Sequence, residues 1–116
     1  MTAKVLCSYH YFKSVDMAEM AGQIGDGRPM LFADSGAFSA KSLGAEVTVD
    51  GYAAWLHKWH QHFTVYVNLD VIGNWKATAA NQARLEAQGL NPIPVFHGGS
   101  PFKELDRLAE RYPYIA

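Results

Sequence analysis

The stretch that decides the fold class is TVYVNLDVI, residues 64–72. It is rich in β-branched and aromatic residues, a composition that is typical of a β-strand. Helical patterns flank it on both sides. Upstream, an apolar stripe with helical spacing consists of Tyr52, Trp55, Leu56, Trp59 and Phe63. Downstream, Asn74 is suited to cap an alanine-rich helix that Gly89 closes.

The same alternation extends in both directions along the chain. Strands are predicted over residues 5–12, 30–33, 92–96 and, at the end of the sequence, 114–116. Helices are predicted after residues that can act as N-caps, namely Ser14, Thr48 or Asp50, Asn74 and Ser100. The first helix is predicted to end at Gly25 and Gly27, and residues 41–46 are predicted to form a loop. Strands that alternate with helices indicate a parallel sheet with right-handed crossovers.

The fold class expected from this order is α/β, with a parallel (β/α) barrel of the TIM type. A complete barrel takes roughly 200 residues or more, whereas this chain has 116. We therefore expect residues 1–116 to form one domain, an N-terminal barrel portion of about four to five β/α units that is truncated before the later strands. An open doubly wound sheet is the alternative. The end of the chain within a predicted strand favours truncation, because it would leave a sheet edge uncovered.

Composition and charge restrict the class of protein. Apolar residues make up 49% of the chain and charged residues 18%, which is an ordinary globular composition. The net charge of −1 provides no overall basic excess for binding nucleic acid. One cysteine, Cys7, excludes a disulfide framework and a cysteine-rich zinc site within the chain. Because the sequence has no apolar segment of the signal-peptide or membrane-span type, we expect a cytoplasmic protein without membrane contact.

Polar residues and glycines gather where three predicted strands end. They are Asp34, Ser35 and Gly36 after the second strand, Asn68 and Asp70 in the third, and His97, Gly98 and Gly99 after the fourth. Because the carboxyl ends of parallel strands meet at one edge of a sheet, these groups could converge on one ligand.

Each group also has a purely structural explanation. Residues 34–36 have the composition of a common turn, and residues 97–99 have that of a strand-to-helix turn. Asp70 could cap the following helix, although Asn74 is better placed. The recurrence at three strand ends favours the functional interpretation, since two carboxylates beside an apolar pocket suit acid–base or glycosyl chemistry.

At these residues the sequence resembles the tRNA-guanine transglycosylase family, the queuine tRNA-ribosyltransferases, and most closely its phage branch of deazaguanine DNA transglycosylases. The family's Asp-Ser-Gly-Gly-aromatic motif corresponds to DSGAF at residues 34–38. The family Asp that ends the next strand corresponds to Asp70, and the Gln-Gly-Gly motif corresponds to HGG at residues 97–99. Order and spacing agree from about Met30 to Ala116.

The resemblance implies a (β/α)₈ barrel and a pentosyltransferase that exchanges guanine for a 7-deazaguanine in DNA or tRNA. In such a reaction a carboxylate attacks the anomeric carbon of the sugar and guanine leaves. The incoming base then displaces the carboxylate, so that one displacement is divided into two steps. The target base must leave its stack to reach the pocket.

The resemblance also implies roles for residues of this chain. Asp70 would accept hydrogen bonds from N1–H and the exocyclic amine of guanine, because an ionised carboxylate only accepts. Asp34 would be the catalytic residue, contacting the base or moving a proton. The other substrate-binding residues would be Ser35 through a hydrogen bond, Gly36 within the motif, Phe38 by stacking on the purine, His97 facing the purine carbonyl, and Gly98 and Gly99 allowing the approach.

The sequence departs from the family pattern at two positions. Ala37 stands for the second Gly, and His97 stands for Gln, which leaves the identity of the base open. The family's nucleophile and its Cys/His zinc site lie in a later part that this sequence does not contain. We therefore expect no cofactor or metal within this chain and no activity of the chain alone. The choice between DNA and tRNA and the identity of the deazaguanine are also open.

Two other functions remain as alternatives. A metal-dependent barrel hydrolase could use His10, Asp70 and His97 as ligands. A non-catalytic partial barrel could act by association, as a homo-oligomer formed through its apolar edge. His57 and His60, three residues apart, are more typical of a solvated surface than of a metal site.

Overall fold

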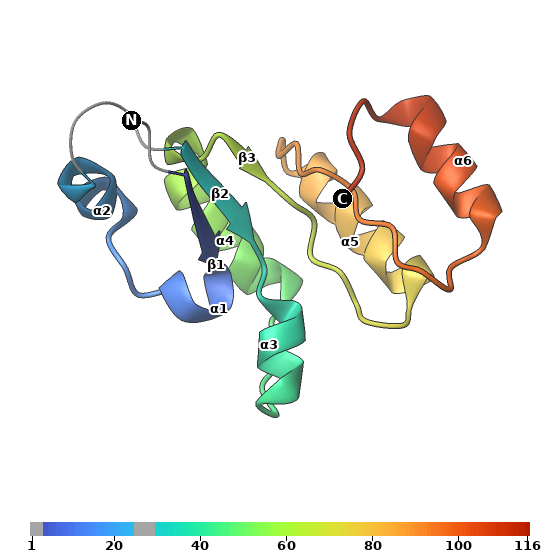
Figure 1. Cartoon of the computed structure of the whole chain (residues 1–116), viewed down its shortest axis with the longest axis horizontal. Coiled ribbons are helices and arrows are strands. Elements are labelled where there is room, and N and C mark those ends of the chain that lie inside the picture. The colour runs from blue at the N-terminus through green and yellow to red at the C-terminus, as the bar shows by residue number, and fades with distance from the viewer. Residues whose placement is uncertain (1–3, 25–29) are drawn as a thin grey trace.

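The computed structural model describes residues 4–24 and 30–116 (Figure 1). The strands are β1 (Lys4–Ser8), β2 (Met30–Asp34) and β3 (Val65–Tyr66). The helices are α1 (Tyr9–Phe12), α2 (Met17–Gln23), α3 (Ala37–Ser42), α4 (Val49–Trp59), α5 (Trp75–Ala87) and α6 (Phe102–Arg111), with a 3₁₀ turn η1 at His60–His62. The predicted end of the first helix at Gly25 and Gly27 lies outside the described residues.

The sheet is parallel and has the strand order β1-β2-β3. Leu6 pairs with Phe32, and Phe32 pairs with Val65, so the three strands lie in register. A single parallel bridge between Val67 and Ile93 extends the sheet. The α/β class and the parallel pairing expected from the sequence are therefore found.

The predicted barrel is wrong for this chain, because the part that the structure describes holds a three-stranded open sheet that does not close on itself. Two features of the sequence explain why the ladder is so short. The predicted strand over 64–72 pairs as a strand only at Val65–Tyr66 and as a bridge at Val67, since the backbone of Leu69 and Val71 bonds to side chains of α5. The predicted strand over 92–96 is reduced to the bridge at Ile93, because Pro92 and Pro94 have no N–H to donate.

Other elements differ from the sequence pattern in their bounds. The predicted strand over 5–12 ends at Ser8 and continues as α1, because the ring of Tyr9 packs on Tyr52 and Trp55 of α4. The predicted loop over 41–46 is partly the end of α3. At 114–116 no strand forms, although Ala116 bonds to the backbone of residues 94 and 96.

The helix signals agree better with the structure. Thr48 caps α4 through Gly51 N–H, and Asn74 caps α5 through Ala77 N–H. The cap of α2 is Asp16 rather than Ser14. The N-cap position of α6 is Pro101 rather than the predicted Ser100, and it makes no side-chain cap bond. None of the helices in residues 4–24 and 30–116 has the length and apolar character that crossing a membrane requires.

The core lies between the sheet and α4, which runs behind β1 and β2 in Figure 1. Alternate residues of each strand point to the same face. The face toward α4 carries buried side chains that include Cys7, Leu31 and Ala33, which meet Tyr52, Trp55 and Leu56 of the helix.

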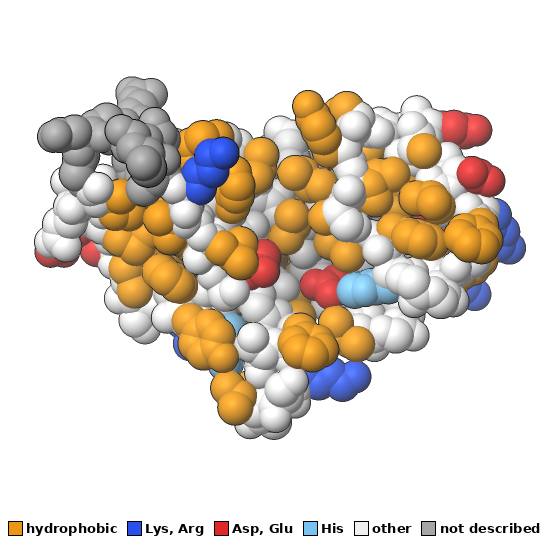
Figure 2. Space-filling view, viewed as in Figure 1, with side chains coloured by type: hydrophobic (Ala, Val, Ile, Leu, Met, Phe, Trp, Pro, Cys, Tyr) orange, Lys and Arg blue, Asp and Glu red, His pale blue; other side chains and the backbone are white. Residues whose placement is uncertain are grey.

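Within residues 4–24 and 30–116, no helix covers the opposite face of the sheet in this way. Its paired row Leu6, Phe32 and Val65 crosses all three strands, and Leu6 is 63% exposed. Apolar side chains occupy much of the face turned to the viewer in Figure 2. Between them, acidic and histidine side chains lie close together near the middle of this face (Figure 2).

Candidate functional site

The candidate site lies at the carboxyl ends of the strands, where the sequence predicts it. Asp34 is the last residue of β2, Asp70 lies in the loop after β3, and His97 follows the bridged residue Ile93. In a parallel sheet such ends face the same edge. All of these side chains belong to the part of the chain that the structure describes.

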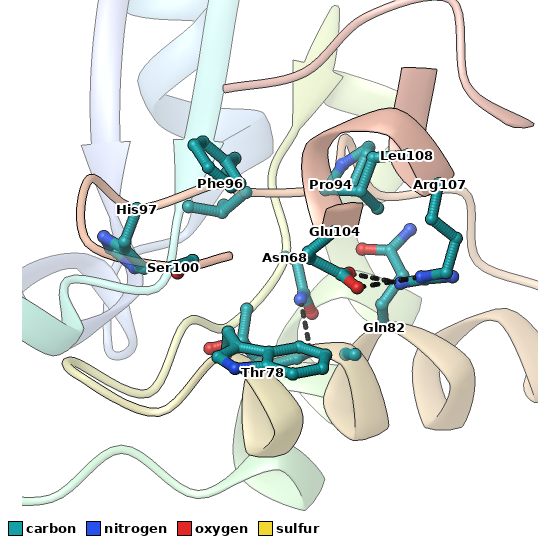
Figure 3. A pocket seen from close by; sticks show the side chains of 13 residues that line it. Asn68, Thr78, Gln82, Pro94, Phe96, His97, Ser100, Glu104, Arg107 and Leu108 are labelled. Carbon is teal, nitrogen blue, oxygen red and sulfur yellow. Dashed lines mark hydrogen bonds and ion pairs between the residues drawn. The ribbon is translucent and has the colours of Figure 1, made fainter. Parts of the chain in front are cut away.

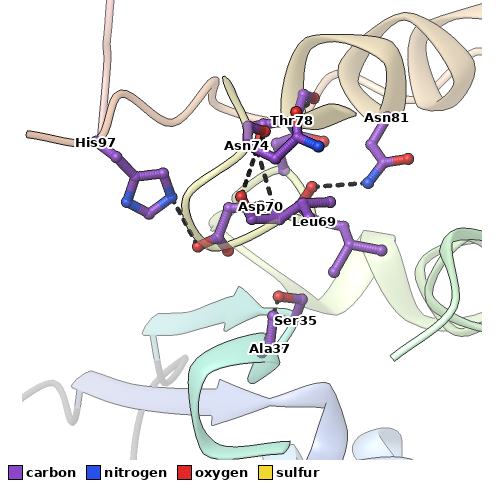
Figure 4. A network of polar contacts seen from close by, with 10 residues as sticks. Ser35, Ala37, Leu69, Asp70, Asn74, Thr78, Asn81 and His97 are labelled. Atoms are coloured by element: carbon purple, nitrogen blue, oxygen red, sulfur yellow. Dashed lines mark hydrogen bonds and ion pairs between the residues drawn. The ribbon is translucent and has the colours of Figure 1, made fainter. Parts of the chain in front are cut away.

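Asp70 and His97 are in direct contact. Nε2 of His97 lies 3.0 Å from Oδ2 of Asp70, and the two side chains are 31% and 19% exposed (Figure 4). The contact is within ion-pair distance but is not an aligned hydrogen bond, since Nε2 is buried and has no hydrogen-bond partner within the described residues. The pair thus places an acceptor beside an N–H group whose hydrogen-bonding capacity is unused, in the tautomer that carries the proton on Nε2.

The DSG turn, residues 34–36, places one bonded hydroxyl and one buried carboxylate oxygen at the candidate site. Ser35 is 1% exposed, and its Oγ accepts from Ala37 N–H at 3.2 Å, so the hydroxyl of Ser35 supports the turn. In Asp34, Oδ1 is buried and lacks a hydrogen-bond partner among residues 4–24 and 30–116. One oxygen of this carboxylate is therefore buried and unsatisfied among the described residues.

Gly36 owes its identity to packing. Its φ of 69° is left-handed, and a Cβ built there would lie 2.8 Å from Cβ of His10. His10 N–H in turn donates to Ser35 O at 3.3 Å. The glycine thus allows α1 to approach the DSG turn closely.

Both carboxylates influence one buried phenol, Tyr52. Burial raises the pKa of Tyr52 well above its ordinary value, and the nearby acidic groups, first of all Asp34 and also Asp70, raise it further. The hydroxyl donates to Val67 O at 2.6 Å. Since the charges of Asp34 and Asp70 both reach this hydroxyl, they belong to one electrostatic environment.

The thiol of Cys7 lies near the same environment. Burial, followed by the charge of Asp34, raises the pKa of Cys7, so the thiol stays protonated and unreactive. Cys7 is buried in the core, which agrees with a structural role for this residue.

A groove of about 490 Å³ opens beside Asp70. It lies between the α3–α4 connection and the loop after β3, and its lining includes Ala37, Glu46, Asp70 and Asn81. Its size is within the usual range for small-ligand sites. Asp34 and His97 are not among its lining residues. Of these three side chains, the groove therefore borders Asp70 alone.

Of the predicted site residues, Asp70 lines this groove and the other seven do not, and three of those seven are exposed at the surface. Phe38 is 71% exposed, and Gly98 and Gly99 are exposed. A Cβ at Gly98 would have no neighbouring atom within 4 Å, and at Gly99 the φ of 95° explains the glycine. Their roles toward a base stay predictions.

A second, narrow cavity lies behind His97, between α5, α6 and residues 94–97 (Figure 3). Its volume of about 10 Å³ is close to that of one water site. Glu104 is buried and pairs with Arg107 at one side of it. Asn68 and Gln82 line it as well, and each leaves one buried amide oxygen without a partner among the described residues.

Sequence reasoning missed the polar residues of α5 that hold the Asp70 loop (Figure 4). These are Thr78 and Asn81, which bond to the backbone on either side of Asp70. A signal was present, since a Thr and an Asn three residues apart fall on one face of a helix. That pattern is also common on solvated helices. Tertiary contacts are needed to distinguish a polar pair that faces solvent from one that holds a loop.

The residues proposed as metal ligands do not assemble into a metal site. Within residues 4–24 and 30–116, no group of three His, Cys, Asp or Glu side chains is arranged to hold a metal ion. His57 bonds instead to Gln88, with Nε2 and Oε1 3.2 Å apart. His10 packs edge-on against Tyr11.

No family model, curated protein or solved structure matches this chain. The resemblance to guanine transglycosylases therefore stays a prediction from the sequence motifs at residues 34–38, Asp70 and 97–99.

Proposed function

We propose that this chain recognises a guanine-type base and contributes the base-binding part of an enzyme that exchanges guanine for a 7-deazaguanine in DNA or tRNA. The observation that carries the proposal is the contact of Asp70 with His97 at 3.0 Å beside a groove of about 490 Å³. The proposal concerns the recognition of a base and is independent of a closed barrel.

The chemistry of the pair complements the pairing edge of guanine. That edge presents a carbonyl oxygen followed by two N–H donors. The N–H group of His97 would donate to the carbonyl, and Asp70 would accept from N1–H and the exocyclic amine. Adenine presents an acceptor at N1, which would face the carboxylate and be repelled. A 7-deazaguanine keeps the guanine edge, so both the outgoing and the incoming base would fit.

Asp34 would act on the same base. Its buried Oδ1 has no hydrogen-bond partner within the described residues, which leaves it available to bind the base or move a proton. In the exchange, a carboxylate nucleophile bonds to the anomeric carbon as the bond to guanine breaks, and the incoming base then breaks the carboxylate–sugar bond. The family's nucleophile has no counterpart among the matched residues, so we assign base recognition, and no exchange, to this chain alone. We place the activity in the cytoplasm, where the thiol of Cys7 would stay reduced.

Calorimetric titration of the purified chain with guanine, 7-deazaguanine and adenine tests the proposal. We expect guanine and 7-deazaguanine to bind with similar affinity and adenine to bind at least about tenfold more weakly, a difference of about 1.4 kcal/mol. His97→Ala should weaken both guanine-type ligands, whereas Asp106→Asn, at an exposed position of α6, should change neither. Equal binding of the three bases, or no binding, would contradict the proposal.

A second candidate function is association with another copy of the chain, for which the uncovered sheet face is the specific observation. Leu6, Phe32 and Val65 form one apolar row across this face. Sedimentation would show a concentration-dependent dimer that Leu6→Asp abolishes. A monomer at all concentrations would rule out this candidate.

A further inference from the structure

The loop that carries Asp70 depends on α5 for its backbone hydrogen bonds. Residues that follow β3 leave the sheet ladder after the bridge at Val67, so their polar backbone groups need other partners. Helix α5 supplies these partners from a single turn, which runs from Thr78 to Asn81 (Figure 4).

Each neighbour of Asp70 in the chain is held by one side chain of this turn. On the N-terminal side, Nδ2 of Asn81 donates to Leu69 O at 3.1 Å. On the C-terminal side, Val71 N–H donates to Oγ1 of Thr78 at 2.9 Å. Thr78 is buried, and its hydroxyl has two acceptors within reach, Asn74 O at 2.9 Å and Val71 O at 3.3 Å.

A third bond joins the same turn to the end of the strand. Nδ2 of Asn68 donates to Thr78 O at 2.8 Å, and Asn68 is almost fully buried. The backbone is thus attached to α5 before and after Asp70, while the carboxylate itself contacts His97. The position of this carboxylate is therefore set through its neighbours.

We propose that Thr78 and Asn81 are positioning residues for the Asp70 carboxylate, holding it at the angle and distance that base recognition requires. This inference rests on the proposed function and adds to it the residues that determine selectivity indirectly. A site that is displaced by about 1 Å can lose about a hundredfold in efficiency, so two bonds that flank one recognition residue have a large effect on selectivity. Asn81 also lines the groove beside Asp70, which places this clamp next to the ligand.

The test uses Thr78→Val, Asn81→Leu and Thr78→Ser in the full chain. Valine removes the acceptor for Val71 N–H with little change of shape, leucine removes the donor to Leu69 O, and serine retains the hydroxyl. Asn74→Ala is the matched control, because it removes the α5 cap bond to Ala77 N–H and leaves the side-chain clamp of Leu69 and Val71 in place.

The first measurement is the ratio of guanine to adenine affinity. We expect Thr78→Val and Asn81→Leu each to reduce this ratio by about tenfold. Thr78→Ser should keep the wild-type ratio. Asn74→Ala should lower the melting temperature without changing the ratio. Unchanged ratios in both clamp variants would overturn the inference.

The second measurement needs no ligand, so it separates the inference from the proposed function. Amide hydrogen exchange at Val71 should be faster by about tenfold or more in Thr78→Val than in Thr78→Ser, because a buried hydrogen bond protects the amide. If the wild-type chain binds neither purine, the proposed function fails, and protection of Val71 still decides whether the clamp exists. Equal exchange rates in the valine and serine variants would refute the clamp. If Thr78→Val does not fold, amide exchange at residues 69–71 in Asn81→Leu provides the same test.

Discussion

Two regions of one sheet follow different physical rules. In the apolar half, defined as β1, β2 and α4, strand residues such as Leu31 and Cys7 are fully buried against Tyr52 and Leu56. In the polar rim, defined as residues 67–74 together with Asp34 and His97, the backbone bonds to side chains and the charged groups stay partly exposed. The comparison teaches that burial determines the fold here, whereas side-chain hydrogen bonds determine where the candidate site lies.

The largest effect should come from opening a cavity in the apolar half. Leu31→Ala is expected to lower the free energy of unfolding by about 2–5 kcal/mol, because Leu31 is fully buried between the sheet and α4. Leu6→Ala, on the uncovered face of the same sheet, is the matched control and should cost less than about 0.5 kcal/mol. Urea unfolding measures both variants. Equal losses would show that the two faces of the sheet are not different.

The next largest effect is expected from a substitution at Gly36, which lies between the two regions. Gly36→Ala and Gly44→Ala both place a side chain at left-handed φ, which costs about 1–2 kcal/mol. Only at Gly36 would the new Cβ also meet His10, at 2.8 Å, since Gly44 has open space around it. Thermal unfolding should therefore show a clearly greater loss for Gly36→Ala. A greater loss at Gly44 would mean that α1 does not pack on the DSG turn as described.

Features of the two regions that depend on interactions between residues close in sequence could be predicted, whereas features that depend on distant residues could not. The apolar stripe from Tyr52 to Trp59 in α4, the caps Thr48 and Asn74, and the parallel pairing of strands are local or periodic signals, and they were confirmed. The predicted continuation of the stripe to Phe63 was wrong, because α4 ends at Trp59 and Phe63 is extended. The barrel and the length of the third strand were wrong. Whether residues 68–72 continue a ladder depends on Thr78 and Asn81, and such non-local competition for backbone groups leaves no periodic trace.

The site shows the same division. That Asp70 and His97 lie at one sheet edge could be inferred from parallel topology, whereas their contact at 3.0 Å required the tertiary structure. Ser35 illustrates the converse case, because its hydroxyl is used within the turn. Residue type alone could not separate this use from a bond to a base. The assigned roles in base binding stay predictions.

A pH titration of stability sharpens the link between the two regions, because Tyr52 belongs to the apolar half and senses the rim. Its pKa is raised in the folded state, mainly by burial and then by the charge of Asp34. The contribution of its neutral form is thus fully present below about pH 10, the ordinary pKa of tyrosine. Stability should fall as the pH rises from there through the higher folded-state pKa. Tyr52→Phe should remove most of this alkaline loss in chemical unfolding, and an identical loss in the variant would contradict the assignment.

The smallest effect is expected at the exposed surface where α4 meets α5. Arg84 and Asp50 form an exposed ion pair between α5 and α4, with 2.9 Å between nitrogen and oxygen. Exposed pairs contribute little, so Arg84→Ala should change the free energy of unfolding by less than about 0.5 kcal/mol. Urea unfolding at low and high salt measures this contribution. A loss comparable to that of Leu31→Ala would mean that α5 is held to α4 mainly by charge.

The central claim is that the Asp70 carboxylate reads the donor edge of a guanine-type base. Asp70→Asn tests this most directly, because an amide offers one acceptor and one donor in nearly the same shape. Calorimetric titration of the wild-type and variant chains with guanine and adenine should show a preference for guanine in the wild type that is lost or reversed toward adenine in Asp70→Asn. A variant that keeps the full wild-type preference for guanine would contradict the claim.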